Sequence, residues 1–185
     1  MKMEEIIRQT VEVLQQGGTI LYPTDTIWGI GCDARNAAAV EKLYAIKERD
    51  RSKSMLVLVS SEFGDWSSEI GDRPTTYILP RSIWHDEMHF EVASNLPAAD
   101  GSLGLREPKH AFCQEVLRRL GAPLVSTSAN LSGRPSPYIY NDIEESLKSR
   151  VDFCVPPLPV FLSGETCGSR IVKVKEDGSQ EIIRP

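Results

Sequence analysis

The sequence lacks the patterns that mark zinc proteins, secreted proteins and membrane proteins. Its cysteines have no C-x-x-C spacing, and it contains only three histidines. We therefore expect no zinc site and no disulfides, but four ordinary thiols at Cys32, Cys113, Cys154 and Cys167. No apolar run approaches the length of a signal peptide or a membrane span, which predicts a cytoplasmic protein.

Two common nucleotide-binding patterns are also missing. The chain has no P-loop, and Gly29-Ile30-Gly31 lacks the later glycine of a dinucleotide fingerprint. A nucleotide site in this chain would therefore have to use side-chain cations and hydroxyls where a P-loop uses its backbone.

Apolar runs alternate with helical patterns along the chain, which predicts an α/β fold with a mixed sheet. Helical spacing indicates helices at about 3–16, 36–49, 110–120 and 142–147. Short apolar runs indicate strands near 19–22, 55–59, 75–79, 102–106 and 123–126. Residues 171–174 and 181–184 resemble a hairpin around Asp177-Gly178. With 185 residues, 41% of them hydrophobic, a single domain over 1–185 is expected.

A polar segment, Tyr-Pro-Thr-Asp-Thr-Ile-Trp-Gly-Ile-Gly at 22–31, follows the first predicted strand. Such a loop can display hydroxyls and open backbone to a small polar ligand at a strand end. The same residues can also form only a helix cap or a turn. The local pattern leaves both interpretations open.

Basic residues gather at the end of the second predicted helix, although the whole chain has a net charge of -5. Five cations face two carboxylates there: Lys42, Lys47, Arg49, Arg51 and Lys53, with Glu48 and Asp50. They could offset the helix dipole at a solvated helix end. They could also bind a phosphate or a carboxylate, for which lysine supplies a point charge and arginine a fork.

A third polar group follows the strand predicted at 123–126. The hydroxyls of Ser126, Ser128 and Ser136 and the amide of Asn130 are uncharged donors that can hold a nucleotide. They can also satisfy neighbouring backbone groups, as such side chains often do.

Five motifs occur in order along nearly the whole chain. They are the segment at 22–31, Lys-x-Arg at 47–49, Leu-Arg-Glu-Pro-Lys-His at 105–110, Ser-Thr-Ser-Ala-Asn-Leu-Ser-Gly at 126–133 and Arg-Pro at 184–185. In this order they make the chain resemble the YrdC-type threonylcarbamoyl-AMP synthase family. The resemblance implies a single YrdC-like domain, in which a twisted mixed β-sheet is flanked by helices and curves around a concave cavity.

The resemblance also implies an activity. A nucleotidyltransferase of this family joins L-threonine, bicarbonate and ATP into threonylcarbamoyl-AMP and pyrophosphate, for threonylcarbamoyladenosine modification of tRNA. Mg²⁺ would arrive with ATP and would need no dedicated protein site. Further partners would be tRNA or tRNA-modifying proteins.

The resemblance also implies roles for individual residues, at the positions where this sequence matches the motifs of the family. Lys47 and Arg49 would be the catalytic cations at the phosphates, with Lys53 as a helper. The residues expected to bind threonine are Thr26, Arg106, Ser126 and Ser169. Those expected to hold the nucleotide are Ser102, Ser128, Asn130, Ser136 and Arg184.

The chain also departs from the family pattern, which keeps two alternatives open. Leu58 stands where members commonly have a threonine-binding histidine, and Asp50 and Ser54 replace prolines. The segments at 60–76 and 164–169 are shortened. The chain could therefore be a diverged paralogue without full synthase activity, or an RNA-binding module. A pI near 5.3 does not give the broad basic surface expected of an RNA binder.

Overall fold

The computed structural model describes residues 2–52, 54–61, 73–86, 90–158 and 168–185. In these residues nine strands form one mixed sheet in the order β7-β1-β2-β6-β3-β5-β4-β8-β9. The pairs β1/β7, β3/β5 and β4/β8 are parallel and the other neighbours are antiparallel. The strands are β1 Ile20–Tyr22, β2 Gly29–Asp33, β3 Leu56–Leu58, β4 Thr75–Leu79, β5 Leu103–Arg106, β6 Leu124–Ser128, β7 Phe153–Cys154, β8 Arg170–Val174 and β9 Gln180–Arg184.

Helices cover the two faces of the sheet. They are α1 Met3–Gln15, α2 Ala37–Lys47, α3 Arg81–Trp84, α4 Ala111–Leu120 and α5 Glu145–Lys148. One buried cluster joins α1 and α4 to β1 and β3, and it includes Ile6, Leu58 and Val116. A second buried cluster includes Leu43 of α2 and Val57 of β3. Since neighbouring residues of a strand point to opposite faces, α2 packs on the face opposite α1 and α4.

Both ends of α2 are fixed by local hydrogen bonds. The Asn36 side chain accepts a hydrogen bond of 3.0 Å from the Ala39 N–H and so caps the N-terminus of the helix. At the other end Glu48 adopts a left-handed conformation with φ 50°, and the Arg49 N–H donates to the Tyr44 carbonyl. This turn directs Lys47 and Arg49 to different surroundings.

Most of the predicted elements are confirmed, but one interpretation was wrong. The segment 22–31 was expected to be a loop, whereas Gly29–Asp33 forms β2 between β1 and β6. Glycines are uncommon in strands, so the pattern concealed it. Here Gly31 is required by close packing, because an added Cβ would lie 2.1 Å from the Val125 carbonyl oxygen. The helix expected at 142–147 is α5, preceded by a 3₁₀ turn at Tyr140–Asp142.

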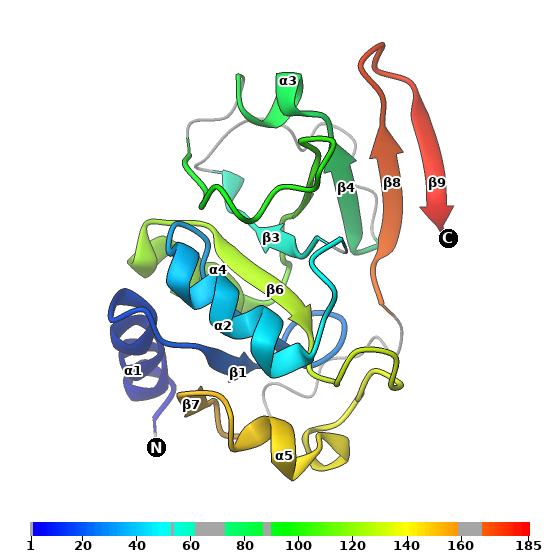
Figure 1. Ribbon diagram of the computed structural model, residues 1–185. Coiled ribbons are helices and arrows are strands. Elements are labelled where there is room, and N and C mark those ends of the chain that lie inside the picture. Colours follow the sequence, from blue (N-terminus) through cyan, green and yellow to red (C-terminus); the bar gives the residue numbers. More distant parts are fainter. Residues whose placement is uncertain (1, 53, 62–72, 87–89, 159–167) are drawn as a thin grey trace.

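Part of the face that carries α1 and α4 is not covered by any helix that the structure describes. The boundary runs across β3, where Leu58 packs in the α1/α4 cluster and Leu56, on the same face, borders a cavity. Figure 1 shows β8 and β9 at one edge of the sheet, with the C-terminus at the end of β9, and β7 near the N-terminus at the other. None of the helices that the structure describes is long and apolar enough to span a membrane.

Candidate functional site

A cavity of about 580 Å³ lies on this uncovered part of the sheet. Strand after strand supplies it with alternate residues, because every second side chain of a strand faces the same way. These positions are Gly29 of β2, Ser126 and Ser128 of β6, Leu56 of β3, Gly104 and Arg106 of β5, Thr76 and Ile78 of β4, and Ile171 of β8. Residues from nearly the whole length of the chain therefore meet at one site.

The charged residues among the described lining of the cavity are all arginines. Arg49, Arg106 and Arg184 line it, and no aspartate, glutamate, lysine or histidine is among the described lining residues. The whole chain has more acidic than basic residues, so its composition does not explain a group of three arginines without a carboxylate. Three guanidinium groups on hydroxyl-rich walls make the cavity suited to an anion.

The loop between β1 and β2 is tied to itself. The Thr24 hydroxyl donates to the Ile27 carbonyl at 2.7 Å and accepts from the Thr26 N–H at 3.1 Å. The hydroxyl oxygens of Thr24 and Thr26 lie 3.1 Å apart, and both residues line the cavity. The sequence left two alternatives for this loop, a turn and a display of hydroxyls to a ligand. Thr24 and Thr26 do both, because they stabilise the turn and also line the cavity.

Arg106 is held in a buried ion pair, with only 3% of its surface exposed. Its Nη1 donates to the Thr26 hydroxyl at 3.1 Å, and its Nη2 lies 3.4 Å from Asp25 Oδ1. The other Asp25 oxygen accepts from the Lys109 N–H at 3.0 Å. Arg106 Nε and Asp25 Oδ1 make no hydrogen bond within the described structure. Arg106 therefore has an N–H group, at Nε, that could donate to an incoming carboxylate if the guanidinium moved slightly.

Two buried serines line the cavity beside Arg106. The Tyr22 hydroxyl donates to Ser126 Oγ at 2.6 Å, and burial raises the pKa of Tyr22, so that it stays a neutral donor. The Ser169 and Thr76 hydroxyls lie 2.7 Å apart. Sequence reasoning had missed Tyr22 and Thr76, although Thr76 shares its face of β4 with the cavity and alternation could have indicated it.

Arg184, on the last strand, closes the other side of the cavity. Its Nε donates to the Ser169 carbonyl at 2.8 Å, and the guanidinium lies against Gly168. An added Cβ at Gly168 would be 2.9 Å from Arg184 Nη2, so a larger residue would displace the arginine. β9 thus brings a cation to residues that lie about fifteen positions earlier.

Lys47 does not line the cavity but supports one of its walls. Its ammonium donates to the carbonyls of Ser128 and Asn130 at 2.5 and 2.7 Å, and the side chain is only 1% exposed. The Lys47 carbonyl in turn accepts from the Ser132 N–H at 3.0 Å. Lys47 therefore holds the loop after β6 in place. Burial, with a smaller contribution from Arg49, lowers the pKa of Lys47 to about 7.

This lowered pKa predicts a stability that depends on pH. Between pH 7 and about 10.5 the unfolded chain keeps a proton that folded Lys47 releases, so the free energy of unfolding rises with pH. A neutral amine still has two N–H groups for the two close carbonyls. We expect the difference in unfolding free energy between the unaltered protein and Lys47→Met to grow by about 2 kcal/mol from pH 7 to 9. Urea unfolding would measure it; a constant difference would show that Lys47 keeps its ordinary pKa.

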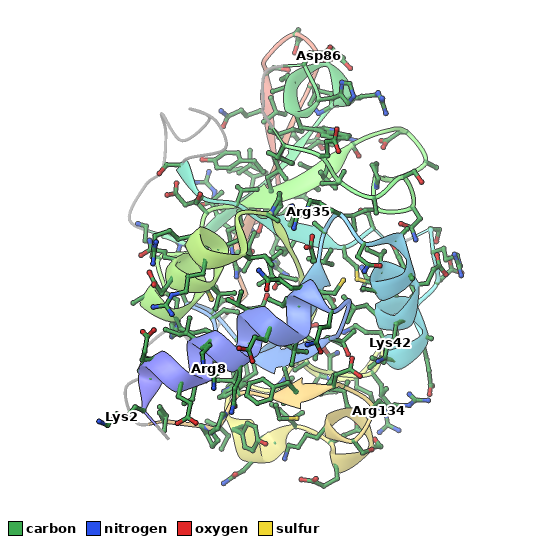
Figure 2. The ribbon with its side chains drawn as sticks, turned by 90° about the vertical axis from the view of Figure 1, so that its left-hand side faces the viewer. Lys2, Arg8, Arg35, Lys42, Asp86 and Arg134 are labelled. Carbon is green, nitrogen blue, oxygen red and sulfur yellow. The ribbon has the colours of Figure 1, made fainter. Side chains whose placement is uncertain are left out.

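The other cations of the basic run separate in the structure. Arg49 lines the cavity and donates to the Ser54 carbonyl at 2.9 Å. Lys42 pairs with Asp152 at the surface of α2 (Figure 2), and Arg51 pairs with Glu41. Lys53 lies outside the described residues. The run is therefore not one anion site: one arginine reaches the cavity and one lysine braces its wall.

The predicted nucleotide residues divide in the same way. Ser128 and Ser136 line the cavity. Asn130 lies beside it, where its amide donates to the carbonyls of Leu131 and Arg134 and shapes the loop. Ser102 directly precedes β5, but its hydroxyl donates to Asp100 at 2.6 Å and it is not among the lining residues.

Three of the departures from the family pattern can be placed, and one of them, Ser54, lines the cavity. Leu58 is fully buried and pairs with Arg106 and Leu124 on the neighbouring strands, but it packs under α1 and α4 and is not among the described lining residues of the cavity. Asp50 is exposed, accepts from the Ser52 N–H at 2.7 Å and does not line the cavity. Most of the shortened segment at 60–76, and residues 164–167 of the later one, lie outside the described residues.

Within the described ranges, the cysteines form no disulfide and no cluster of side chains could bind a metal ion. Cys32, Cys113 and Cys154 are free thiols, and burial raises the pKa of each; Cys167 lies outside these ranges. No group of three or more histidine, cysteine, aspartate or glutamate residues in the described part of the chain could hold a metal ion.

The sheet and its arginine-lined cavity define an α/β protein whose cavity is suited to an anion. Residues 12–185 match the family model Sua5_yciO_yrdC, whose description is "Telomere recombination". The chain therefore belongs to the Sua5/YciO/YrdC family.

Relatives named threonylcarbamoyl-AMP synthase match almost end to end. The protein of that name from Photobacterium profundum is 28% identical over 188 residues, covering 96% of this chain and 97% of the relative. That from Vibrio campbellii is 29% identical over 192 residues, covering 95% of this chain and 96% of the relative.

Solved structures share the fold at low sequence identity. P. abyssi Sua5 complexed with L-threonine has a TM-score of 0.81 at 20% identity; the match covers 100% of this chain and 55% of that one. The chain thus spans just over half of that Sua5. E. coli YciO has a TM-score of 0.75 at 22% identity, covering 99% of this chain and 89% of that one. The predicted fold, a mixed sheet flanked by helices, is confirmed.

Proposed function

We propose that this protein is an L-threonylcarbamoyladenylate synthase, a nucleotidyltransferase that makes threonylcarbamoyl-AMP and pyrophosphate from L-threonine, bicarbonate and ATP. The observation that carries the proposal is a cavity lined by three arginines and, among its described residues, no carboxylate. Curated relatives of the same length carry the synthase name, and a structure of the same fold holds L-threonine. Its product would supply the threonylcarbamoyl group for modification of tRNA.

The reaction joins two anions, which explains the need for the arginines. Bicarbonate takes up a proton to give carbon dioxide and water, and the threonine amine then adds to the carbon dioxide and releases a proton to form a carbamate. A carbamate oxygen then attacks the α-phosphorus of ATP; the new phosphorus–oxygen bond forms as the bond to the β-phosphate oxygen breaks and pyrophosphate leaves. Fixed cations offset the repulsion between carbamate and triphosphate before they meet, and positioning supplies the rest of the acceleration.

Each arginine has a role that fits its surroundings. Arg106, in the buried wall with Thr26, Ser126 and Ser169, would bind the threonine carboxylate. Arg49 would bind the phosphates, and Arg184 would bind the nucleotide on the β9 side. Lys47 would act by holding the loop that presents Ser128.

Mg²⁺ would enter with ATP. The described lining residues offer hydroxyl oxygens but no carboxylate, so they fit a metal held by the phosphates and water better than a metal held by the protein. Bound there, it would add positive charge at the β- and γ-phosphates.

The proposal is tested by incubating the protein with ATP, Mg²⁺, bicarbonate and labelled L-threonine and separating the products. We expect a labelled adenylate and an equal amount of pyrophosphate, and neither when threonine or bicarbonate is omitted. Absence of the adenylate from complete mixtures would exclude synthase activity. A salt titration with tRNA on filters would then show whether the cavity serves RNA binding instead.

A further inference from the structure

Tyr138 is an aromatic residue that remains open to solvent in the cavity wall. It lines the cavity, yet 52% of its surface is exposed. The other aromatic among the described lining residues, Trp28, is only 5% exposed and packs edge-on against Tyr140 at a ring distance of 5.0 Å. Tyr138 is therefore the lining aromatic whose ring has room for a ligand.

The loop that carries Tyr138 is anchored on both sides. Before it, the Asn130 amide binds the Arg134 carbonyl at 2.6 Å, and Pro137 is buried. After it, Tyr140 packs against Trp28 and also lies under the Lys148 ammonium, 4.5 Å from the ring centre. Because the flanking residues are fixed, the exposed ring of Tyr138 is held at the cavity rather than displayed by a loose segment.

The wall around Tyr138 matches the uncharged end of a nucleotide. Pro135 and Ser136 line the cavity from the same loop, and Ser128 precedes them in β6. These residues bring a ring, a proline and hydroxyls without any charge, whereas the arginines come from α2, β5 and β9 and their flanking turns. A nucleotide has the same division, with a planar base at one end and phosphates at the other.

We propose that Tyr138 is the stacking platform for the purine base of the bound nucleotide, and so determines how tightly a nucleoside triphosphate binds compared with its phosphates alone. Base–aromatic stacking is favourable and tolerates any base, because every base has a π-face. The inference rests on the proposed function, since it takes ATP to be the ligand.

The test compares two probes, ATP with Mg²⁺ and inorganic triphosphate with Mg²⁺, by calorimetric titration of the full chain. Tyr138→Ala should weaken ATP binding by about tenfold and leave triphosphate binding unchanged, because only the base is lost from the platform. Tyr138→Phe, which keeps the ring, should bind ATP within about twofold of the unaltered protein. Ile139→Ala is the matched control: Ile139 is the next residue, 50% exposed and not among the lining residues, so its removal should change neither affinity.

Three results would overturn the platform. They are unchanged ATP binding in Tyr138→Ala, an equal loss for both probes, and an equal loss in Ile139→Ala; the last two would mean that the loop was merely disturbed. If the unaltered protein bound neither probe, the proposed function itself would fail. Binding of the two probes to the unaltered protein thus distinguishes a failure of the proposed function from a failure of the stacking proposal.

Discussion

Replacing Arg106 by glutamine is expected to reduce threonine-dependent adenylate formation by about 100-fold, while ATP binding persists. Arg106 is the buried cation of the wall with Ser126 and Ser169, and losing the proposed charge-assisted contact with the substrate carboxylate would cost roughly 3 kcal/mol. The loss should appear in kcat/KM for threonine, measured at saturating ATP.

The same change should destabilise the protein, because it leaves the Asp25 carboxylate, whose side chain is only 10% exposed, beside a neutral side chain. Breaking a buried ion pair from one side costs about 3–5 kcal/mol. The double variant Asp25→Asn/Arg106→Gln removes both charges and should recover much of that stability without recovering activity. Asp25→Asn alone keeps the guanidinium and should retain most threonine use. If the double variant regained activity together with stability, Arg106 would be a structural residue and not a substrate contact.

Arg49→Ala should weaken ATP binding by roughly 10- to 100-fold, as expected for the loss of a hydrogen bond to a charged group at about 1.5–3 kcal/mol. Arg51→Ala is the matched control two residues later. Arg51 is exposed, pairs with Glu41 and is not among the lining residues, so its removal should leave ATP affinity within about twofold, in line with the small contribution of surface pairs.

Calorimetric titration of both variants with ATP and Mg²⁺ measures this difference. Threonine binding, if measured separately, should be little affected in either variant. Equal ATP affinities in Arg49→Ala and Arg51→Ala would mean that the basic run is only a solvated helix end, the alternative that its composition allowed.

The fold was largely predictable because its elements have strong local patterns. α1, α2 and α4 carry apolar residues at helical spacing, and Asn36 and Gly121 mark an N-cap and a C-cap. β2 was not predicted, because its glycines reflect packing against a strand distant in the sequence. Only the position of Val125 on β6 explains why residue 31 must be a glycine. The strand order, with β6 between β2 and β3, likewise depends on pairings between distant residues.

The sequence indicated part of the cavity lining but not the separate positions that the predicted residues take in the structure. The motif order indicated Arg49, Arg106 and Arg184, and all three line one cavity. No pattern showed that Lys47 turns to the carbonyls of Ser128 and Asn130, because the left-handed turn at Glu48 separates it from Arg49. Asp25 also gave no signal of its own, since its pairing with Arg106 joins residues about eighty positions apart.

We expect one cavity to hold both an amino acid and a nucleotide. A crystal structure of the protein with L-threonine and a non-hydrolysable ATP analogue would show where each one binds. We predict the threonine carboxylate within hydrogen-bond distance of Arg106 and the phosphates at Arg49, with the threonine nitrogen facing the α-phosphate. A threonine bound away from Arg106, or a nucleotide bound outside the cavity, would contradict the account.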